Sequence, residues 1–323
     1  MPDGFLGRFG SLFRVMRESL HPYTLPMAGG GRREGVLVRY VEEISAVGWG
    51  DTSPLPGWSG ESLEDVIALR DVPSLRCGRE AALASIQGFA SWPRHHLRVP
   101  LNAMLDGDRD AMVDQARVAA DEGCQCFKIK TRGHSLDALC SVLDAILDVA
   151  GRDVQLRLDP NRGWDFSEAL EITKSLRGYP IQYIEEPLQD SGRLMEFIGA
   201  SCLPVALDET LREISPDELE KYLGAAALVL KPTLMGGFER ARDFAHAGAV
   251  HGMLSAVSAC FESGVGIYSL GRFAASLEKC AAAGLDTYSR LEGDVLESRL
   301  SFPGYCFDAT QCMPPIDRHV IAF

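Results

Sequence analysis

Cys-Phe-Lys-Ile-Lys at residues 126–130 and Val-Gln-Leu-Arg-Leu-Asp at residues 154–159 are short apolar runs that each end in a charged residue. Between them, apolar residues recur at helical spacing, at Leu136, Leu139, Leu143, Ile146 and Leu147. An amphipathic helix that joins two buried strands is the βα unit of a parallel sheet. This stretch therefore predicts a strand, a helix and a second, parallel strand.

The same arrangement repeats from about residue 98 onward. The predicted strands are Val99–Leu105, Cys126–Lys130, Val154–Asp159, Tyr183–Glu186, Val205–Asp208, Ala227–Lys231 and Met253–Ser258. The charged strand ends from Lys130 to Lys231 lie 29, 26, 23 and 23 residues apart, which leaves room each time for one helix and two loops. In one connection, Ser215-Pro216-Asp217-Glu218 has the N-cap serine and first-turn proline of a helix start. Seven such units predict a modified TIM-type (β/α)7β barrel.

Residues 1–97 follow a different pattern. Gly35–Tyr40 and the run that ends at Trp49 are predicted to pair as antiparallel strands, and Ser62–Leu69 begins a helical pattern. We therefore expect an α+β capping domain at 1–97, a barrel catalytic domain at 98–290, and a C-terminal segment at 291–323 that packs back on the cap. The Gly29-Gly30-Gly31 run with Arg32 and Arg33 is typical of a flexible loop and is weak evidence for phosphate binding.

Composition narrows the class of protein. The net charge of -13 argues against nucleic acid as a partner. Nine scattered cysteines without a C-x-x-C pair indicate reduced thiols, and Cys124 and Cys126 are expected in the core. The first twenty residues contain no apolar run long enough for a signal peptide or membrane span. We therefore expect a cytoplasmic protein without a membrane partner.

Five predicted strand ends carry charge, in the order Lys, Asp, Glu, Asp, Lys. They are Lys128-Ile129-Lys130, Leu158-Asp159-Pro160-Asn161, Ile184-Glu185-Glu186-Pro187, Leu207-Asp208-Glu209 and Leu230-Lys231-Pro232. Because the C-terminal strand ends of a parallel barrel form one face, these side chains are expected to converge. Three carboxylates on adjacent strands would repel one another in a desolvated cleft unless a cation held them. All-oxygen ligation favours Mg²⁺, for which Mn²⁺ could substitute.

The lysines on either side of the carboxylates are candidate acid–base residues. A lysine with a buried stem and another cation nearby has a lowered pKa, which a base near neutral pH requires. Lys128 and Lys130 point to the same side of their strand, so one can lower the pKa of the other. Neighbouring residues on a strand point to opposite faces, so the pattern alone does not choose between Glu185 and Glu186.

This order of groups resembles the muconate-lactonising branch of the enolase superfamily. Further segments, over about residues 35–290, are similar to the o-succinylbenzoate synthases. They are Gly48-Trp49-Gly50-Asp51-Thr52-Ser53-Pro54-Leu55-Pro56-Gly57, Leu156-Arg157-Leu158-Asp159 with Asn161-Arg162, Asp208-Glu209-Thr210-Leu211-Arg212-Glu213, Lys231-Pro232-Thr233-Leu234 and Gly284-Leu285-Asp286-Thr287.

The resemblance implies an activity and a role for each strand-end residue. By it, Asp159, Glu185 and Asp208 bind the metal, Lys130 transfers the proton, and Lys231 is its partner across the substrate ring. The family is a carbon–oxygen lyase of menaquinone biosynthesis that dehydrates 2-succinyl-6-hydroxy-2,4-cyclohexadiene-1-carboxylate to o-succinylbenzoate. The base takes the proton α to the carboxylate, the metal stabilises the enediolate, and the same lysine returns the proton to the departing hydroxide. The expected partner is therefore a small-molecule carboxylate.

A second set of residues is expected to bind substrate or support the site. It comprises Lys128, Arg157, Asn161, Ser258, Ala259 and Cys260. Ala259 and Cys260 stand in a stretch that is usually Ser-rich in the family and contacts the succinyl tail. Backbone N–H contacts survive this change, whereas hydroxyl contacts do not. No histidine is placed beside Cys260 by the sequence, which favours a packed thiol over a nucleophile. Arg157 and Asn161 either contact the substrate or brace Asp159.

Two other functions share parts of this pattern. N-acylamino acid racemases and dipeptide epimerases have the same lysine and metal framework, and the fold does not decide the substrate. A dipeptide epimerase is expected to carry an acidic motif for the α-ammonium group after the seventh strand, but Ser258–Phe261 contains no Asp. A non-catalytic scaffold is expected to have lost a base or ligand, yet all five positions are occupied. The sequence predicts no oligomeric state.

Overall fold

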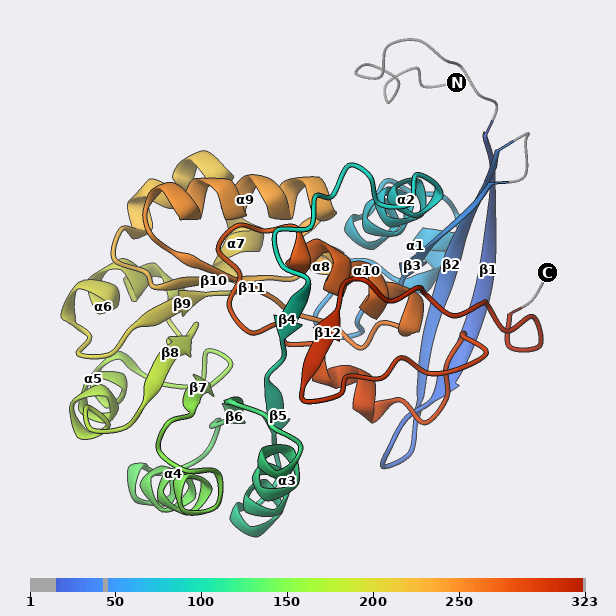
Figure 1. The fold of residues 1–323 in the computed structure, drawn as a ribbon. Coiled ribbons are helices and arrows are strands. Elements are labelled where there is room, and N and C mark those ends of the chain that lie inside the picture. Colours follow the sequence, from blue (N-terminus) through green and yellow to red (C-terminus); the bar gives the residue numbers. More distant parts are fainter. Residues whose placement is uncertain (1–15, 43–45, 322–323) are drawn as a thin grey trace.

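The structure is a computed structural model that describes residues 16–42 and 46–321. The prediction that the chain begins without a signal peptide falls largely on residues 1–15, outside the described residues. Within the described ranges, no helix is both long and apolar enough to cross a membrane. Figure 1 shows a cap of strands and helices beside a ring of alternating strands and helices.

Seven parallel strands form one curved sheet in which each strand pairs with its neighbours in sequence. They are β5 (Ala103–Leu105), β6 (Cys126–Lys130), β7 (Gln155–Asp159), β8 (Ile181–Glu185), β9 (Val205–Leu207), β10 (Ala227–Leu230) and β11 (Leu254–Val257). Residues 280–284 take the eighth position, through parallel bridges from Cys280 and Gly284 to the β11 segment and from Ala283 to Leu101. The predicted (β/α)7β barrel is therefore confirmed.

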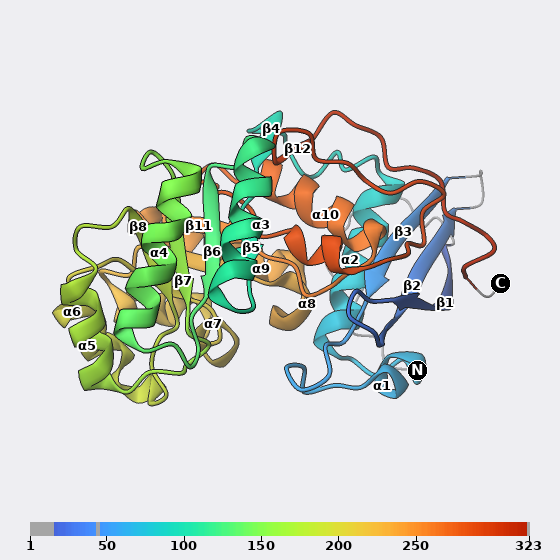
Figure 2. The same cartoon turned by 90° about the horizontal axis from the view of Figure 1, so that it is seen from below.

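Helices surround the barrel, as the view in Figure 2 shows for α3 to α6. The helices of this unit are α3 (Arg109–Asp121), α4 (Leu136–Ala150), α5 (Phe166–Ser175), α6 (Leu194–Ala200), α7 (Thr210–Glu213), α8 (Pro232–Met235), α9 (Phe238–Val250) and α10 (Gly264–Ala275). The stripe predicted from Leu136 to Leu147 is the inner face of α4, where Leu139, Leu143 and Ile146 are buried. The helix predicted at Ser215 begins with its capping box, but Pro216–Tyr222 is a 3-10 helix, η2. A further 3-10 turn, η1 (Ser191–Arg193), precedes α6.

The first predicted barrel strand, Val99–Leu105, is wrong as a single strand. Its first part is β4 (Arg98–Pro100), which pairs antiparallel with β12 (Cys306–Asp308) outside the barrel sheet. Only β5 joins the barrel, next to β6. Pro100 has no N–H to donate to a ladder, and proline therefore favours an edge position over a central strand.

The cap is a three-stranded antiparallel sheet packed against a helix. Its elements are β1 (Met16–Pro26), β2 (Arg32–Glu42), β3 (Val47–Thr52), α1 (Leu63–Ile67) and α2 (Pro73–Ile86). The expected pairing of Gly35–Tyr40 with the run to Trp49 is part of the β2–β3 ladder. A Cβ on Gly50 would overlap the carbonyl oxygen of Gly78 on α2. Gly50 therefore allows α2 to lie directly on β3.

The chain after η3 (Asp286–Arg290) contacts both the cap and the barrel unit. Leu291 forms an antiparallel bridge with Met27, and the N–H of Glu292 donates to the carbonyl oxygen of Pro26 at 2.9 Å. Further on, β12 pairs with β4. Figure 1 shows this segment running from the barrel past β4 to the edge of the cap.

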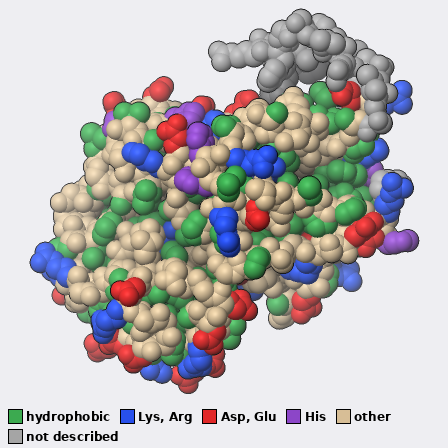
Figure 3. All heavy atoms as spheres, viewed as in Figure 1, with side chains coloured by type: hydrophobic (Ala, Val, Ile, Leu, Met, Phe, Trp, Pro, Cys, Tyr) green, Lys and Arg blue, Asp and Glu red, His purple; other side chains and the backbone are tan. Residues whose placement is uncertain are grey.

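The state of the cysteines and the distribution of surface charge can be compared with what the composition predicts. All nine cysteines are free, and Cys124 and Cys126 are buried, as expected for core residues. On the face drawn in Figure 3, acidic and basic side chains are interspersed around the outer helices. On this face, acidic side chains are therefore not gathered in one patch, although the whole chain has a net charge of -13.

The arginines next to the glycine run do not belong to a flexible loop. Gly29, Gly30 and Gly31 form the turn between β1 and β2 with φ values of 82°, 90° and 98°, where glycine is favoured. Arg33 is buried within β2. Its guanidinium donates to carbonyl oxygens of the cap and of the loop after β11, namely those of Ser53, Pro54, Cys260 and Phe261. Arg33 therefore joins the cap to the C-terminal end of the barrel.

A buried carboxylate forms a second link between cap and barrel. Asp51 on β3 accepts hydrogen bonds from the N–H of Ser263 at 2.7 Å, from the Ser263 hydroxyl at 2.8 Å and from the Tyr23 hydroxyl at 2.9 Å. Desolvation by burial raises the pKa of Asp51 to about 6, although these donors oppose the shift. The native state consequently holds a proton on Asp51 at pH values where the unfolded chain has lost it.

We expect the free energy of unfolding to fall as pH rises from about 4 through 6 because of Asp51. Because the native pKa is raised, Asp51 stabilises the native state fully at pH values below its pKa in the unfolded chain. This stabilisation, about 3 kcal/mol, is lost as the pH rises through the native pKa. Glu80, whose pKa burial raises to about 7, acts in the same direction. Urea unfolding between pH 4 and pH 8 should show a shallower pH dependence in Asp51→Asn than in wild type.

The exposed Asp71, which pairs with Arg76, offers a matched control for this measurement. Asp71→Asn should leave the pH dependence of unfolding close to that of wild type, since surface ion pairs contribute little. An Asp51→Asn protein with the wild-type slope would contradict the assignment of the effect to Asp51.

Candidate active site

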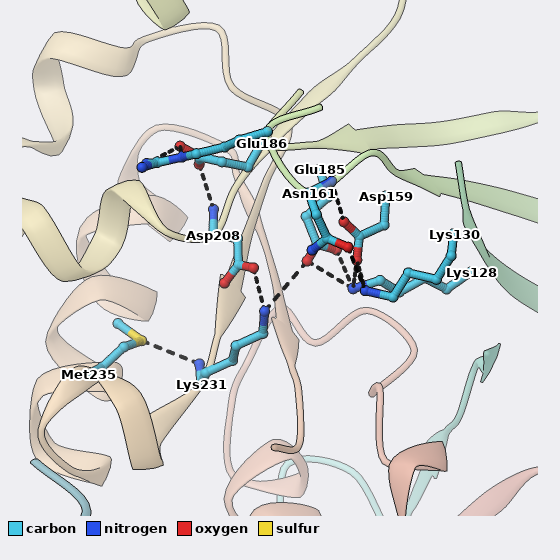
Figure 4. Close-up of polar contacts among 10 residues, drawn as sticks. Lys128, Lys130, Asp159, Asn161, Glu185, Glu186, Asp208, Lys231 and Met235 are labelled. Atoms are coloured by element: carbon cyan, nitrogen blue, oxygen red, sulfur yellow. Dashed lines mark hydrogen bonds and ion pairs between the residues drawn. The ribbon is translucent and has the colours of Figure 1, made fainter. Parts of the chain in front are cut away.

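The five strand-end groups converge at the C-terminal ends of adjacent strands. Lys130, Asp159 and Glu185 are the last residues of β6, β7 and β8, while Asp208 and Lys231 directly follow β9 and β10. Since the strands pair in the order β6 to β10, the three carboxylates lie between the two lysine-bearing strands. Figure 4 shows the side chains pointing toward one another.

Ammonium groups lie between the carboxylates. The Nζ atom of Lys128 is 2.9 Å from Asp159 Oδ2 and 2.7 Å from Glu185 Oε2. Lys130 Nζ donates to Asp159 Oδ2 at 2.7 Å. On the other side, Lys231 Nζ donates to Asp208 Oδ2 and is 3.7 Å from Glu185 Oε1. Each neighbouring pair of carboxylates is thus linked through one nitrogen atom.

The site shifts the pKa values of its carboxyl groups in different directions. Burial alone would raise the pKa of Asp159, but the ammonium groups of Lys128 and Lys130 hold it well below its ordinary value. Burial and the neighbouring Asp159 raise the pKa of Glu185. Burial also raises the pKa of Asp208, despite its contact with Lys231. The three neighbouring acids thus differ in how their surroundings favour the charged form.

The expectation of a lowered lysine pKa is wrong for Lys128 and for Lys231 in this arrangement. Burial lowers the pKa of Lys128, but Asp159 and Glu185 more than compensate, so that the pKa lies above its ordinary value. Lys231 is likewise raised, since Asp208 and Glu185 outweigh its burial. Carboxylate oxygens lie in direct contact with both ammonium groups, and opposite charges at contact distance favour the charged form of a lysine.

The donors suit a hard divalent cation. Three carboxylates from β7, β8 and the end of β9 meet without a thiol or imidazole among them, which favours Mg²⁺ over softer metals. In the described part of the chain, no three His, Cys, Asp or Glu side chains converge as a ready-made metal site. The ammonium groups of Lys128 and Lys231 lie between these carboxylates instead and contact the oxygen atoms that would hold the cation.

The two adjacent glutamates face different partners. Glu185 points toward Lys128 and Lys231, whereas the Glu186 side chain points away from them (Figure 4). Glu186 contacts the guanidinium of Arg162 and the hydroxyl of Thr210. The sequence pattern left Glu186 open as an alternative to Glu185 and gave no role to Arg162 or Thr210. Their pairing depends on contacts between separate loops, and no local pattern reveals such contacts.

The backbone at the ends of β7 and β8 is unusual. Asn161, Arg162 and Glu186 have φ values of 48°, 53° and 39°, in the left-handed region that side chains other than glycine rarely adopt. Such residues cost on the order of 1–3 kcal/mol each and persist where the surroundings hold them. The strain therefore lies beside the carboxylates at the ends of the same two strands.

The sequence left open whether Asn161 and Arg157 contact the substrate or brace Asp159. In the structure the two residues lie at different depths in the barrel. Asn161 accepts a hydrogen bond from Lys130 Nζ at 3.0 Å, and its N–H donates to Asp159 Oδ1 at 3.1 Å. Arg157 lies deeper in the barrel, over the ring of Tyr183, and donates to Asn102 Oδ1 at 2.9 Å. Asn161 thus contacts the site directly, while Arg157 fills the barrel interior beneath it.

The backbone N–H groups of the segment after β11 form hydrogen bonds within the protein. The N–H groups of Ser258 and Ala259 donate to the carbonyl oxygens of Leu230 and Gly284, and the N–H of Cys260 donates to the carboxylate of Glu262. These three N–H groups are therefore engaged and are not free to bind a substrate. The Cys260 thiol is buried, and this burial raises its pKa, which disfavours the reactive thiolate.

Comparison with known proteins agrees with this arrangement of strands. Residues 111–311 match the family described as Enolase C-terminal domain-like. The chain is 30% identical over 292 residues to an o-succinylbenzoate synthase of Haemophilus influenzae, covering 83% of this chain and 86% of the relative. It is 32% identical over 278 residues to the o-succinylbenzoate synthase of Citrobacter koseri, covering 80% and 84%.

Solved structures share the fold at lower sequence identity. The L-Ala-D/L-Glu epimerase of Bacillus subtilis has a TM-score of 0.81 at 21% identity and covers 96% of this chain and 99% of its own. A muconate lactonizing enzyme of Pseudomonas fluorescens has a TM-score of 0.82 at 18% identity, with 95% and 98% covered. The structural likeness extends over the cap and the barrel together, and the sequence identity to the two synthases is higher. The chain therefore belongs to the o-succinylbenzoate synthase family of the enolase superfamily.

Proposed function

We propose that this protein is a Mg²⁺-dependent o-succinylbenzoate synthase. It dehydrates 2-succinyl-6-hydroxy-2,4-cyclohexadiene-1-carboxylate to o-succinylbenzoate, a step of menaquinone biosynthesis. The observation that carries the proposal is the row of three buried carboxylates with one lysine-bearing strand on each side. The curated synthases at about 30% identity over most of the chain support the choice of substrate. The nine free cysteines suit a reducing compartment, and we place the enzyme in the cytoplasm.

The proposed metal ligands are Asp159, Glu185 and Asp208. Their oxygen donors suit Mg²⁺, and Mn²⁺ is expected to substitute for it. A related dipeptide epimerase of Enterococcus faecalis has been solved with Mg and a dipeptide. When bound, Mg²⁺ would supply the concentrated positive charge that makes the proton α to the substrate carboxylate acidic enough to remove.

The two lysines divide the remaining work. Lys130, whose side chain is 34% exposed, reaches further into the open end of the barrel than Lys128, which is 10% exposed. We assign the proton transfer to Lys130. It takes the α-proton from the substrate and returns a proton to the departing hydroxide, so that water leaves and the ring becomes aromatic. Lys231, on the opposite side of the carboxylates, stabilises the negative charge that develops on the substrate and faces the ring.

The structure gives one further reason to prefer this reaction over dipeptide epimerisation. The acid nearest to the segment 258–261 in sequence is Glu262, and its carboxylate is buried against the Thr233 hydroxyl and the N–H of Cys260. It is therefore not presented to the α-ammonium group of a peptide. Racemisation of an N-acylamino acid, which lacks that charge, remains the alternative.

Purified wild-type protein is expected to convert the cyclohexadiene carboxylate to o-succinylbenzoate in the presence of Mg²⁺. Turnover, followed by ultraviolet absorbance, should cease when a chelator removes the metal and should return when Mg²⁺ or Mn²⁺ is added, because the reaction needs the cation's charge. No conversion by folded, Mg²⁺-loaded protein would refute the proposal. Racemisation of N-acylamino acids, measured by polarimetry in parallel, would then favour the alternative.

A further inference from the structure

The carboxylate of Glu186 is the centre of a buried hydrogen-bond cluster behind the proposed metal ligands. One oxygen, Oε1, accepts from Arg162 Nη2 at 2.6 Å, from Arg162 Nε at 3.1 Å and from Thr210 Oγ1 at 2.5 Å. The other oxygen, Oε2, accepts from the N–H of Asp208 at 3.0 Å. Glu186 is 1% exposed, so these contacts form away from water. We call Glu186, Arg162 and Thr210 the Glu186 cluster.

This cluster joins the ends of three strands. Arg162 follows β7, Glu186 follows β8, and Thr210 begins α7 after β9. The N–H of Arg162 also donates to the carbonyl oxygen of Glu186 at 3.0 Å. The Glu186 carboxylate therefore links the three loops that follow Asp159, Glu185 and Asp208. The contact with the N–H of Asp208 reaches one of these three directly.

The cluster also reaches the proposed proton-transferring lysine. Arg162 and Asn161 form the left-handed bend after β7. The side chain of Asn161 accepts from Lys130 Nζ, and its N–H donates to Asp159 Oδ1. Because a bend of two residues in this region is held by its surroundings, its geometry depends on the contacts that Arg162 makes with Glu186. A change at Glu186 therefore acts on Asn161, and through it on Lys130 and Asp159.

We propose that Glu186 is a positioning residue that sets the places of Asp208, Asp159 and Lys130 without touching the substrate. This inference rests on the proposed function, because the proposed function assigns the roles of Asp208, Asp159 and Lys130. The charge of Glu186 is required because its carboxylate accepts four hydrogen bonds, whereas a glutamine amide brings two donors of its own to the same position. In Glu186→Gln, the amide NH₂ group therefore meets either the Asp208 N–H or the Arg162 and Thr210 donors.

The chain contains a matched control for Glu186→Gln. Glu213 pairs with the same arginine, at 2.8 Å from Arg162 Nη1, but its side chain is 52% exposed. Glu213→Gln removes a carboxylate from Arg162 without disturbing the buried cluster. We expect its Mg²⁺ affinity and turnover to stay within about twofold of wild type, since exposed ion pairs contribute little.

The test measures Mg²⁺ affinity by calorimetry and, separately, steady-state kinetics at saturating Mg²⁺. In Glu186→Gln we expect the Kd for Mg²⁺ to rise about 10–100-fold, the usual effect of losing a partner behind a metal ligand. At saturating Mg²⁺, kcat should still fall about tenfold, because Lys130 remains displaced, while KM for the substrate changes by less than about threefold. A merely structural role would lower thermal stability and leave both of these quantities near wild type.

Thr210→Val provides a second variant in case Glu186→Gln does not fold. It removes one hydrogen bond from Glu186 at nearly constant volume, and we expect a smaller increase in the Kd for Mg²⁺ in the same direction. Folded variants with wild-type Kd and kcat would overturn the proposal. The Mg²⁺ titration needs no turnover, so it tests Glu186 even if the wild-type protein does not dehydrate the proposed substrate. Conversely, an active wild type with unaffected variants would refute only the role of Glu186.

Discussion

Lys130→Ala is expected to lower kcat at least about 10³-fold and to leave the fold intact. The variant removes the group that we assign to both proton transfers, and a single acid–base residue commonly contributes 10²–10⁴-fold to a rate. The site retains its charge balance around Asp159, because Lys128 Nζ still lies 2.9 Å from Asp159 Oδ2. Ultraviolet assays at saturating Mg²⁺, together with a thermal unfolding curve, measure both effects.

Lys174 on α5 is an exposed lysine that makes no contact with the site and serves as the control. Lys174→Ala should retain wild-type turnover. If Lys130→Ala also turned over at the wild-type rate, the assignment of proton transfer to Lys130 would be wrong, and Lys128 would be the next residue to replace. Because Lys128 is more deeply buried between Asp159 and Glu185, we expect its loss to affect stability as well as rate.

The fold could be predicted largely because its units are local. Cys126–Lys130 is both the predicted run and the observed strand β6, since a short buried strand followed by an amphipathic helix is visible within about 25 residues. The failure at Val99–Leu105 has the opposite cause. Its first part pairs with β12, which lies some 200 residues later in the chain, and no local pattern reports such a partner.

The sequence was enough to predict which charged strand ends converge at the candidate site, but not how their side chains are arranged there. The order of charges on successive strands predicted that Lys130, Asp159, Glu185, Asp208 and Lys231 would converge, because parallel strands end on one face. The directions of the two adjacent glutamates and the pKa of Lys128 could not be predicted in this way. Both depend on distances between loops that only the folded chain defines.

Glu185→Gln is expected to weaken Mg²⁺ binding more than Glu186→Gln does. Glu185 is the proposed ligand in the middle of the three, and its loss removes a charged oxygen donor from the metal itself. We expect the Kd for Mg²⁺ to rise more than about 100-fold, beyond the effect typical of a residue behind the ligands, and turnover to fall accordingly. Calorimetric Mg²⁺ titrations of the two variants, side by side, give the comparison.

The unfolding behaviour of Glu185→Gln separates metal binding from folding. Glu185 lies 2.7 Å from the buried ammonium group of Lys128, so replacing it with neutral glutamine leaves that charge with one partner fewer and should lower the metal-free Tm. Independently of this loss, the rise in Tm that Mg²⁺ causes in wild type should disappear. The reverse order of effects, with Glu186→Gln losing the metal and Glu185→Gln retaining it, would exchange the roles of the two glutamates.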